Sequence, residues 1–567
     1  MEGVSELQKI REGKIKINND TKKNLIRIIF FVILSFCYLI FFFNKQGQPI
    51  IKIDIDGQFN FSRVMGLENI WKSPINFKYF NHCASAVNLM YPWATIYPMY
   101  LLIKLTGSLV GGYYIYFLII TFATFEITYQ CVRHMNQPAL PSIFASVLYT
   151  FSICRTSDIY CRVDMGETIA MTFFPIVLLG IYYLFYDDIP HWKTLTAGMT
   201  LLVYTHVLSL VIAALLVLFF TFISIIRKKF TKSRYISLLK AIGMSILLGS
   251  GFLIPMLQTI LSFKINGPYI VNLFANALTP QQLLSCSLTN TVGGRDVYDP
   301  VFLILFVIII CNLKEIKGFF GDVLIAAVFF TFLSTSLFPW DIFQKIFYIL
   351  QFPWRFITIA TLLFSVVATE IIKSYQVNHP KYRLSRIVEF LILGIVLIHW
   401  GTMTNLNQEN GYHIGTNSQM YTKLITNNSD FNGIGDYYPK LFNNDDSYRY
   451  ISSQMVYANQ SWYVEKANLI NTDKLVFNIE SRCKTKAALP VYVFPGEKVV
   501  LNGVPQLSRA SQKNGATVVD LIDGKNEIEI SYGYSLLARI AWIVSLLSCF
   551  MFNGYILYKR YIKKVTI

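Results

Sequence analysis

Long apolar runs separated by short polar turns fill the chain from residue 25 to residue 400, and a further run covers residues 536–557. The runs are mostly about 15–22 residues long, which is the length that an α-helix needs to cross the hydrocarbon core of a bilayer. Helices satisfy their own backbone hydrogen bonds in lipid, whereas open sheets cannot. The pattern therefore predicts an α-helical polytopic membrane protein with about twelve transmembrane helices.

The boundaries of the spans follow from the polar interruptions. Residues 89–105 are apolar but contain Pro92, Pro98 and Lys104, so we expect a dipping or interfacial helix there. Residues 194–226 are too long for one span and predict two helices that bend near His206. The remaining predicted spans are residues 25–43, 109–132, 140–153, 168–185, 238–257, 301–311, 323–338, 356–372, 387–400 and 536–557.

The distribution of basic residues predicts the orientation. Lysines and arginines gather in the tail 1–24, in the run 227–229 and after residue 558. Basic segments stay in the cytoplasm, so both termini are expected inside. An even number of spans then places the loops 44–107 and 154–167 on the outside of the cell membrane.

Residues 401–535 differ from the rest of the chain because they are rich in Asn, Asp, Ser and Tyr. Alternating apolar and polar positions appear at 475–479, 490–494, 498–501, 517–521 and 527–532. Asn502-Gly503 and Asp523-Gly524 are turn signals between such runs. We expect a small β domain on the outside, followed by a final span and a basic cytoplasmic tail in residues 536–567.

Composition argues against several classes of partner and site. Hydrophobic residues make up 54% of the 567 residues and charged residues only 15%, so the net charge of +17 is better explained by membrane topology than by nucleic-acid binding. The nine cysteines are scattered without a CxxC pair, which argues against a disulfide framework or a zinc site. We expect membrane lipids and no nucleic acid among the partners.

Charged residues in the first outside loop form the first candidate site. Asp56, Asn60 and Arg63 have i, i+4, i+7 spacing, so on a helix they share one face. A carboxylate and a guanidinium just outside the membrane suit a charged ligand, although a solvated helix with an ordinary ion pair has the same spacing. Asp54 is the nearest rival carboxylate because on an extended segment it shares a face with Asp56, but it does not have Asn60 and Arg63 as its i+4 and i+7 partners.

The second outside loop carries five charges between two apolar spans, at Arg155, Asp158, Arg162, Asp164 and Glu167. Charges at the membrane edge usually face a cavity or a partner, and the planar fork of arginine matches phosphate oxygens. The alternative is a juxtamembrane cluster that only fixes the topology.

Two further signals lie near the same membrane face. His206 stands at the predicted bend between two helices, where a packing role or a polar cavity are both open. Gln351-Phe352-Pro353-Trp354-Arg355 is a compact outside motif, although Trp354 could anchor at the interface and Arg355 could extend toward water. The sequence contains no P-loop, HExxH or glycine-rich dinucleotide motif, which argues against an ATPase or a soluble-cofactor enzyme.

Together these segments resemble the YfhO-like bacterial membrane proteins, a group that includes proteins labelled 6-pyruvoyl-tetrahydropterin synthase-related and looks like a branch of the GT-C glycosyltransferases. The group's Asp, polar residue and Arg in the first loop match Asp56, Asn60 and Arg63, with Asn60 standing where the family often has His. Its Arg-x-x-x-Gly-Glu and following Pro match Arg162, Gly166, Glu167 and Pro175. His206, the QFPWR segment 351–355, the Asp-Tyr-Tyr-Pro segment 436–439 and the stretch 490–503 match in the same order.

The resemblance implies a transferase that takes a sugar from a polyprenyl-phosphate carrier on the outer face of a bacterial plasma membrane. In it, Asp56 and Glu167 would be the catalytic carboxylates, and a divalent metal such as Mg or Mn, if used, would be held by them. Residues implied to bind the donor phosphate are Arg63, Arg162, His206 and Arg355. Residues implied to support them are Asn60, Asp54, Arg155 and Asp164.

The expected acceptor is an envelope glycopolymer or glycolipid, with teichoic acid as one example. A flippase for lipid-linked saccharides and a non-catalytic envelope assembly factor are the alternatives. The flippase would show paired repeats or broken helices near the midplane, whereas the enzyme requires carboxylates at the outer rim. Arg162, His206 and Arg355 come from three separate segments that each lie near the outer face. We therefore predict that they converge on one pocket near Asp56.

Overall fold

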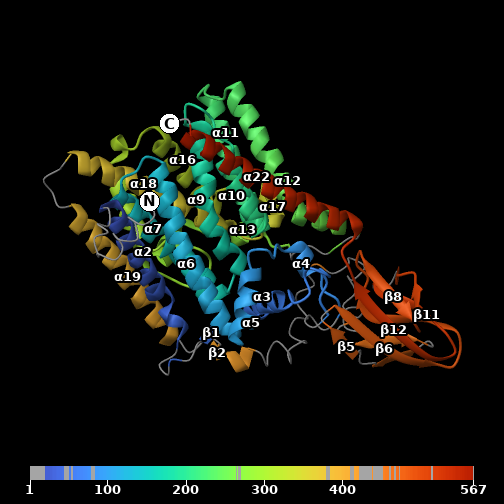
Figure 1. The fold of residues 1–567 in the computed structure, drawn as a ribbon. Helices are drawn as coiled ribbons and strands as arrows, with labels where there is room; N and C mark the ends of the chain where they lie inside the picture. Colours follow the sequence, from blue (N-terminus) through green and yellow to red (C-terminus); the bar gives the residue numbers. More distant parts are fainter. Residues whose placement is uncertain are drawn as a thin grey trace, which may run out of the picture.

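The computed structural model describes residues 19–43, 47, 50–52, 55–77, 83–262, 265, 270–378, 384–408, 414–420, 437, 451, 453–458, 461–464, 468–471, 473–511 and 515–565. They form a bundle of long helices with a separate β domain at one end (Figure 1). This confirms the predicted class, a helical multi-pass membrane protein with a small β domain.

Every predicted span overlaps a helix. Within the described residues, eight helices are long and apolar enough to cross a membrane. They are α2 (Asn19–Leu39), α6 (Leu109–His134), α9 (Met165–Phe185), α11 (Val207–Ile226), α12 (Lys232–Ser262), α18 (Phe356–Asn378), α19 (Leu384–Gln408) and α22 (Leu536–Val565). The other predicted spans are shorter helices, α7 (Ala139–Thr150), α10 (Lys193–Val203), α15 (Pro300–Cys311) and α16 (Gly318–Ser334). The total of twelve crossings therefore stays a prediction.

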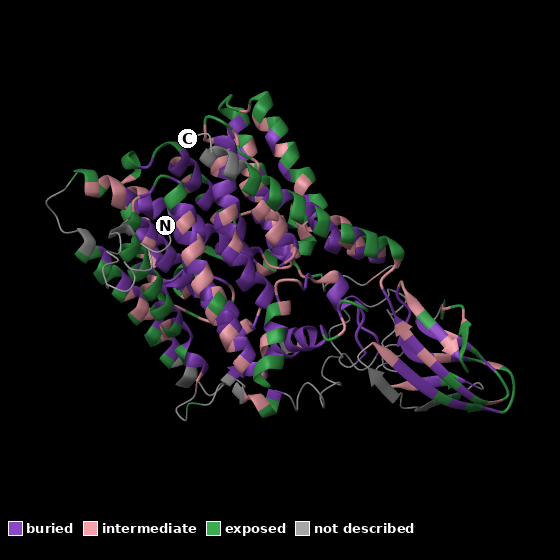
Figure 2. Ribbon diagram, viewed as in Figure 1, coloured by how far each residue is buried: buried purple, intermediate pink, exposed green. Residues whose placement is uncertain are grey.

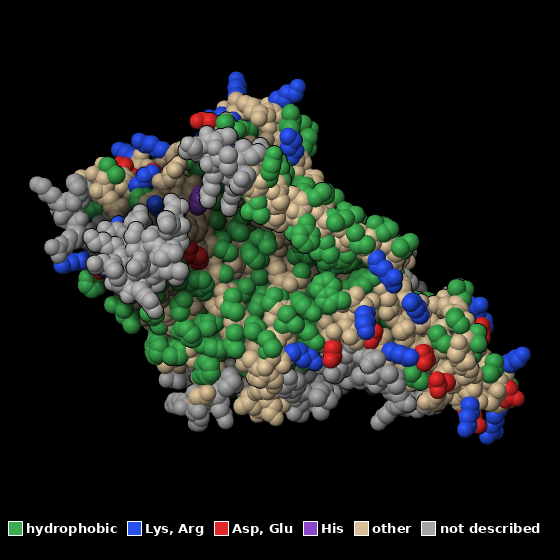
Figure 3. Space-filling view, viewed as in Figure 1, with side chains coloured by type: hydrophobic (Ala, Val, Ile, Leu, Met, Phe, Trp, Pro, Cys, Tyr) green, Lys and Arg blue, Asp and Glu red, His purple; other side chains and the backbone are tan. Residues whose placement is uncertain are grey.

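The centre of the bundle is formed by α9 and α18, whose apolar stretches are 78% and 83% buried. The outer helices expose large apolar side chains, including Leu218, Phe222, Ile304 and Phe550, each more than half exposed. Figures 2 and 3 show this exposed apolar surface over the middle of the bundle, with Lys and Arg gathered toward its ends and on the β domain. Such a surface would be costly in water and matches lipid.

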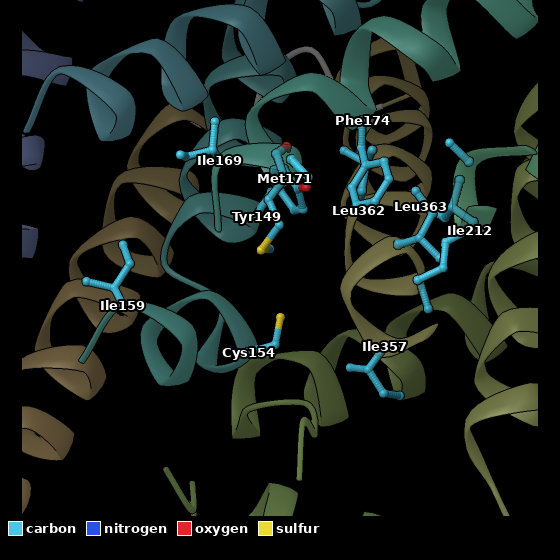
Figure 4. Close-up of a cluster of buried hydrophobic side chains, with 14 of the residues drawn as sticks. Tyr149, Cys154, Ile159, Ile169, Met171, Phe174, Ile212, Ile357, Leu362 and Leu363 are labelled. Carbon is cyan, nitrogen blue, oxygen red and sulfur yellow. Dashed lines mark hydrogen bonds between the residues drawn. The ribbon is translucent and has the colours of Figure 1, made fainter. Parts of the chain in front are cut away.

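Close helix packing in the centre depends on glycine. A Cβ on Gly180 of α9 would lie 2.5 Å from the backbone nitrogen of Leu195 in α10, so only glycine permits this approach. Buried apolar side chains from α7, α9, α11 and α18, such as Tyr149, Phe174 and Leu362, pack together with residues of the segment 153–162 (Figure 4). This packing fixes the segment that carries most of the candidate site.

The segment after the first span is partly helical. It contains β1 (Ile50–Lys52), α3 (Ile55–Met65), α4 (Val87–Met90) and α5 (Tyr97–Thr106). In place of one helix over 89–105 there are two short helices, because Pro92 falls between α4 and α5 and Pro98 stands in the first turn of α5. Neither is near the about 20 residues needed to cross a bilayer, and whether the segment dips into lipid stays a prediction.

The β domain contains two five-stranded antiparallel sheets. One has the order β10-β11-β7-β3-β4 and the other β5-β6-β12-β8-β9. Their bounds are β3 (Met455–Ala458), β4 (Ser461–Val464), β5 (Asn468–Asn471), β6 (Lys474–Ser481), β7 (Thr485–Tyr492), β8 (Glu497–Leu501), β9 (Val504–Gln506), β10 (Arg509–Ala510), β11 (Ala516–Leu521) and β12 (Gly524–Tyr532). The predicted strands are confirmed, since each alternating run overlaps one of them, although the run 490–494 extends two residues beyond the end of β7.

The predicted turn at Asn502-Gly503 is confirmed as well, whereas Gly524 begins β12, which lies in the other sheet from the preceding strand β11. Asn502 and Gly503 have φ of 48° and 79°, so both adopt the left-handed conformation that a two-residue hairpin between β8 and β9 needs. Gly496 cannot be replaced by a residue with a side chain without a clash, because a Cβ there would lie 2.0 Å from the carbonyl oxygen of Gly533. A two-stranded sheet outside this domain pairs β1 with β2 (Ile414–Thr416).

The β domain sits on the first loop of the helical part. Its core includes Ile75, Phe77, Cys83 and Leu89 from that loop together with buried residues of both sheets. The amide of Tyr492 donates a hydrogen bond to the carbonyl oxygen of Cys83 at 2.9 Å. The loop and the β domain therefore share one hydrophobic core. Of the predicted motif 436–439, only Tyr437 lies within the described residues.

Candidate functional site

The second predicted loop is a buried helical segment. It consists of α8 (Ile153–Ser157) and the π-turn η3 (Asp158–Arg162), followed by Val163 and by Asp164, which caps α9 through a 3.0 Å bond from the amide of Glu167. Val163 has a φ of 50°, a conformation that is strained for a β-branched residue. Strain and π-turns are concentrated at functional positions. The structure thus places the loop's charges inside the protein.

Arg162 is the centre of a carboxylate cluster. Its Nη1 donates to Asp158 Oδ1 at 2.7 Å and lies 3.8 Å from Asp296 Oδ1. Its Nη2 lies 3.3 Å from Asp164 Oδ2 and 3.4 Å from Glu167 Oε2. Burial alone would lower the pKa of Arg162, but these four carboxylates raise it well above its usual range. Arg162 therefore carries a full charge and holds the four acids together.

The QFPWR motif brings a second arginine to the same carboxylates. Arg355, at the end of the single turn η6 (Pro353–Arg355), has its Nε 3.4 Å from Glu167 Oε2 and donates from Nη1 to the carbonyl oxygen of Leu350 at 3.0 Å. The ring of Trp354 lies under the guanidinium of Arg162, 4.6 Å from its centroid. The motif is therefore part of the cluster and is not limited to anchoring at the interface.

Two acids in this cluster were not predicted as site residues. Asp158 and Asp296 are buried. Asp158 Oδ2 and both carboxylate oxygens of Asp296 have no hydrogen-bond partner among the described residues. Burial raises the pKa of each well above the usual range, although Arg162 opposes the shift. Asp158 belongs to a charged run that the sequence displays. Asp296 follows Gly-Gly-Arg in a loop before α15, where no pattern points to a partner more than a hundred residues away.

His206 lies at the break between α10 and α11, as predicted. Its ring fits against Gly166, where a Cβ would approach His206 Cδ2 to 3.0 Å, and its Nδ1 is 2.9 Å from Ser209 Oγ. Burial lowers the pKa of His206 to about 4, and Asp164 only partly opposes this shift. The imidazole is neutral at pH 7 and can donate or accept a hydrogen bond, but it adds no positive charge.

The predicted polar face of the first loop is present on α3. Asn60 Nδ2 donates to the carbonyl oxygen of Asp56 at 3.1 Å, and Arg63 Nη1 donates to Asn60 Oδ1 at 3.3 Å. Arg63 is buried, its Nη2 donates to the carbonyl oxygen of Pro92 at 3.0 Å, and its Nε has no partner. Among the described residues, no carboxylate lies within ion-pair distance of Arg63. Asp56 is exposed at the start of this helix.

Electrostatic coupling joins α3 to the cluster. Burial raises the pKa of Asp164, but Arg162 and Arg355 lower it to below the usual range. Burial lowers the pKa of Arg63, and Tyr91, Tyr437 and Asp164 oppose that shift. Arg162, His206 and Arg355, predicted from three separate segments, therefore lie around Asp164 and Glu167, and Arg63 is coupled to Asp164 through electrostatics alone. The contacts that converge are centred on Asp164 and Glu167, while Asp56 lies at the far end of α3.

The remaining predicted residues lie elsewhere. Arg155 is fully buried beside Tyr38, with its Nη2 donating to Thr121 Oγ1 at 3.1 Å. Asp54 lies outside the described residues. Within the described residues, no three His, Cys, Asp or Glu side chains are arranged to hold a metal ion, and Glu167 Oε2 faces two arginines.

No family model matches the chain, and no curated protein matches it. Among solved structures, similar chains include ArnT from Cupriavidus metallidurans bound to undecaprenyl phosphate and the same protein in the apo state. Sequence identities are 11% and 10%, and TM-scores are 0.39 and 0.37. Each alignment covers 62% of this chain and 60% of the other.

Proposed function

We propose that this protein is a membrane glycosyltransferase of the GT-C type that takes a sugar from a polyprenyl-phosphate donor and transfers it to a cell-envelope acceptor on the outer face. The observation that carries the proposal is the convergence of Arg162, Arg355 and His206 on Asp164 and Glu167, with Arg63 electrostatically coupled to Asp164. Buried charges at the end of a membrane bundle are costly, and they usually mark a site for a charged ligand.

The arginines differ in what they can bind. Arg162 is already engaged by four carboxylates, so its main role is to hold them in place. Among the described residues, Arg63 donates only to neutral oxygens, and its Nε has no partner there. Its guanidinium is the cation best suited to the donor phosphate, because a planar fork can bind two phosphate oxygens.

The reaction is a substitution at the anomeric carbon of the sugar. An acceptor hydroxyl forms the new C–O bond, the bond from the anomeric carbon to the phosphate oxygen breaks, and the polyprenyl phosphate leaves with the electron pair. A carboxylate takes the hydroxyl proton as general base, and arginines stabilise the charge that develops on the leaving phosphate. Asp56, which is exposed on the helix that carries Arg63, is the proposed base, with Glu167 as the second catalytic carboxylate.

A resident divalent metal does not fit the described side chains, because Glu167 is paired with two arginines and Asp56 lies at the far end of α3. No step of the proposed reaction therefore passes through a metal.

Mass spectrometry of envelope polymers tests the proposal directly. Cells lacking the protein are expected to lose one glycosyl mass from a single polymer or glycolipid. Wild-type protein should restore this mass and Arg63→Gln should not, although both are inserted in the membrane at the same level. Arg509→Gln, which changes an exposed ion pair in the β domain, is the matched control and should restore it. Envelope polymers that are identical with and without the protein would overturn the transferase assignment.

A further inference from the structure

Tyr91 lies between the two parts of the site that come from the first loop and from the α10–α11 break. Its ring centroid is 4.4 Å from the guanidinium carbon of Arg63, and its ring stacks with that of His206 at a centroid distance of 6.2 Å and an angle of 25°. A ring in this position restricts where both side chains can lie.

The loop that carries Tyr91 also forms hydrogen bonds with Arg63. Asn88 Nδ2 donates to the carbonyl oxygen of Arg63 at 3.2 Å, and Arg63 Nη2 donates back to the carbonyl oxygen of Pro92 at 3.0 Å. These two hydrogen bonds tie α3 to residues 88–92 in both directions. The guanidinium of Arg63 is therefore placed by the loop and not by α3 alone.

The same loop also packs against the β domain. Leu89, one residue from Asn88, is buried in the core that the loop shares with the two sheets. Cys83 accepts the amide of Tyr492 through its carbonyl oxygen, and its Sγ lies 3.5 Å from the carbonyl oxygen of Ile451. The single turn α4 joins this core to Tyr91, so a shift of the β domain is transmitted over a few residues.

A second contact reaches Tyr91 from the other side. Tyr437, in the segment between α19 and the sheets, is buried with its ring edge on that of Tyr91, at 5.7 Å and 88°. Edge-to-face pairs of this kind are favourable beyond their buried area. The two sheets thus contact the Tyr91 loop through their shared core, and Tyr437, which precedes the sheets in the chain, contacts Tyr91 directly.

We propose that Tyr91 is a positioning residue that sets the Arg63 guanidinium and the His206 ring, and that the β domain controls this setting through the loop 83–92 and Tyr437. The role in donor binding rests on the proposed function, whereas the mechanical coupling does not. The β domain then influences the geometry of the site. Molecules that bind the β domain would therefore change the affinity of the site for the donor.

Hydrogen–deuterium exchange of the full-length protein in detergent tests the coupling. Tyr437→Leu and Leu89→Ala are expected to raise amide exchange in the peptides covering α3 and residues 83–92. Tyr437→Phe keeps the ring and should exchange like wild type. Tyr235→Leu, which changes an exposed tyrosine of α12, is the matched control. Wild-type exchange in α3 for both Tyr437→Leu and Leu89→Ala would overturn the coupling.

Binding of undecaprenyl monophosphate tests the consequence for the site. Tyr91→Leu and Tyr437→Leu are expected to weaken binding about tenfold, which is the size of a lost cation–π contact in a desolvated site. Tyr91→Phe should bind like wild type because it keeps the ring. Equal affinity of Tyr91→Leu and wild type would overturn the positioning role. Absence of binding by the wild type would instead count against the proposed function, and the exchange result would still decide the coupling.

Discussion

At the scale of single residues, Arg162 is the cation that faces all four acids of the cluster, three of which are buried. Two arginines, Arg162 and Arg355, face the carboxylates of Asp158, Asp164, Glu167 and Asp296. Several of their oxygens have no hydrogen-bond partner. Breaking a buried ion pair from one side leaves an uncompensated charge, which is more destabilising than the pair is stabilising.

Arg162→Gln is therefore expected to destabilise the protein by about 3–5 kcal/mol, seen as a lower midpoint of thermal denaturation in detergent. The loss should shrink as the pH falls. Asp158 and Asp296 already have raised pKa values in the folded state, so protonation favours the folded form and stability is regained at lower pH. Arg509→Gln, at a pair that is about half exposed on both sides, should cost less than about 1 kcal/mol. Equal losses in the two variants would show that the cluster does not depend on Arg162.

Asp56→Asn keeps the shape of the side chain and removes its charge. Loss of a general base typically costs about 10²–10⁴ in rate, so sugar transfer should be nearly abolished while membrane insertion is unchanged. Glu167→Gln should also lower the rate of sugar transfer, because Glu167 faces both Arg162 and Arg355. Asp54→Asn is the control and should be much milder. Full transfer by Asp56→Asn, measured on the envelope polymer identified by mass spectrometry, would remove Asp56 from the mechanism.

At the scale of elements, the position of the α10–α11 break depends on how closely α9 and α10 approach. Gly180 of α9 touches the backbone of α10 at Leu195, and Gly198 of α10 touches Val177 of α9, where a Cβ would lie 2.9 Å from the Val177 nitrogen. The two glycines bring the helices into direct backbone contact. His206 follows the end of α10, so this contact sets where its ring meets Gly166.

Gly180→Ala is expected to destabilise the protein by about 1–3 kcal/mol, because the added methyl group would overlap backbone atoms that cannot rotate away. Gly243→Ala in α12 has open space around its Cβ and should stabilise the protein by about 0.5–1 kcal/mol. Denaturation midpoints of the two variants give the comparison. A neutral Gly180→Ala would mean that α9 and α10 can move apart without cost.

At the scale of the whole molecule, the β domain and the basic ends of the helices lie apart. Figure 1 shows the C-terminal end of α22 and the α11–α12 turn at one end of the bundle, and the β domain at the other. The α11–α12 turn carries Arg227, Lys228 and Lys229. The positive-inside rule predicts that this end is cytoplasmic and that the β domain and the site face outward.

Leu507→Cys tests this orientation, because its side chain is 75% exposed in the β domain. On a background in which the nine native cysteines are replaced, it should react with an impermeant thiol reagent in intact cells. Lys229→Cys, in the exposed α11–α12 turn, should react only after lysis. The reverse pattern would invert the topology and remove the site from the outer face.

The sequence by itself determined the features that depend on local pattern. Run lengths in hydrocarbon and alternation in a sheet identified the helices, the strands and the Asn502-Gly503 hairpin, because each depends on near neighbours in the chain. The i, i+4, i+7 spacing likewise placed Asn60 next to Arg63 on α3. These features need no knowledge of distant contacts.

Tertiary structure decided which charges meet. Asp296 joins Arg162 from a loop 134 residues further along the chain, and packing of the bundle turns the segment 153–162 inward although its charges are typical of a solvated loop. The protonation of His206 was also decided there, because burial sets its pKa at about 4. Charge pairing and desolvation depend on distance in space, and a single sequence records only distance along the chain.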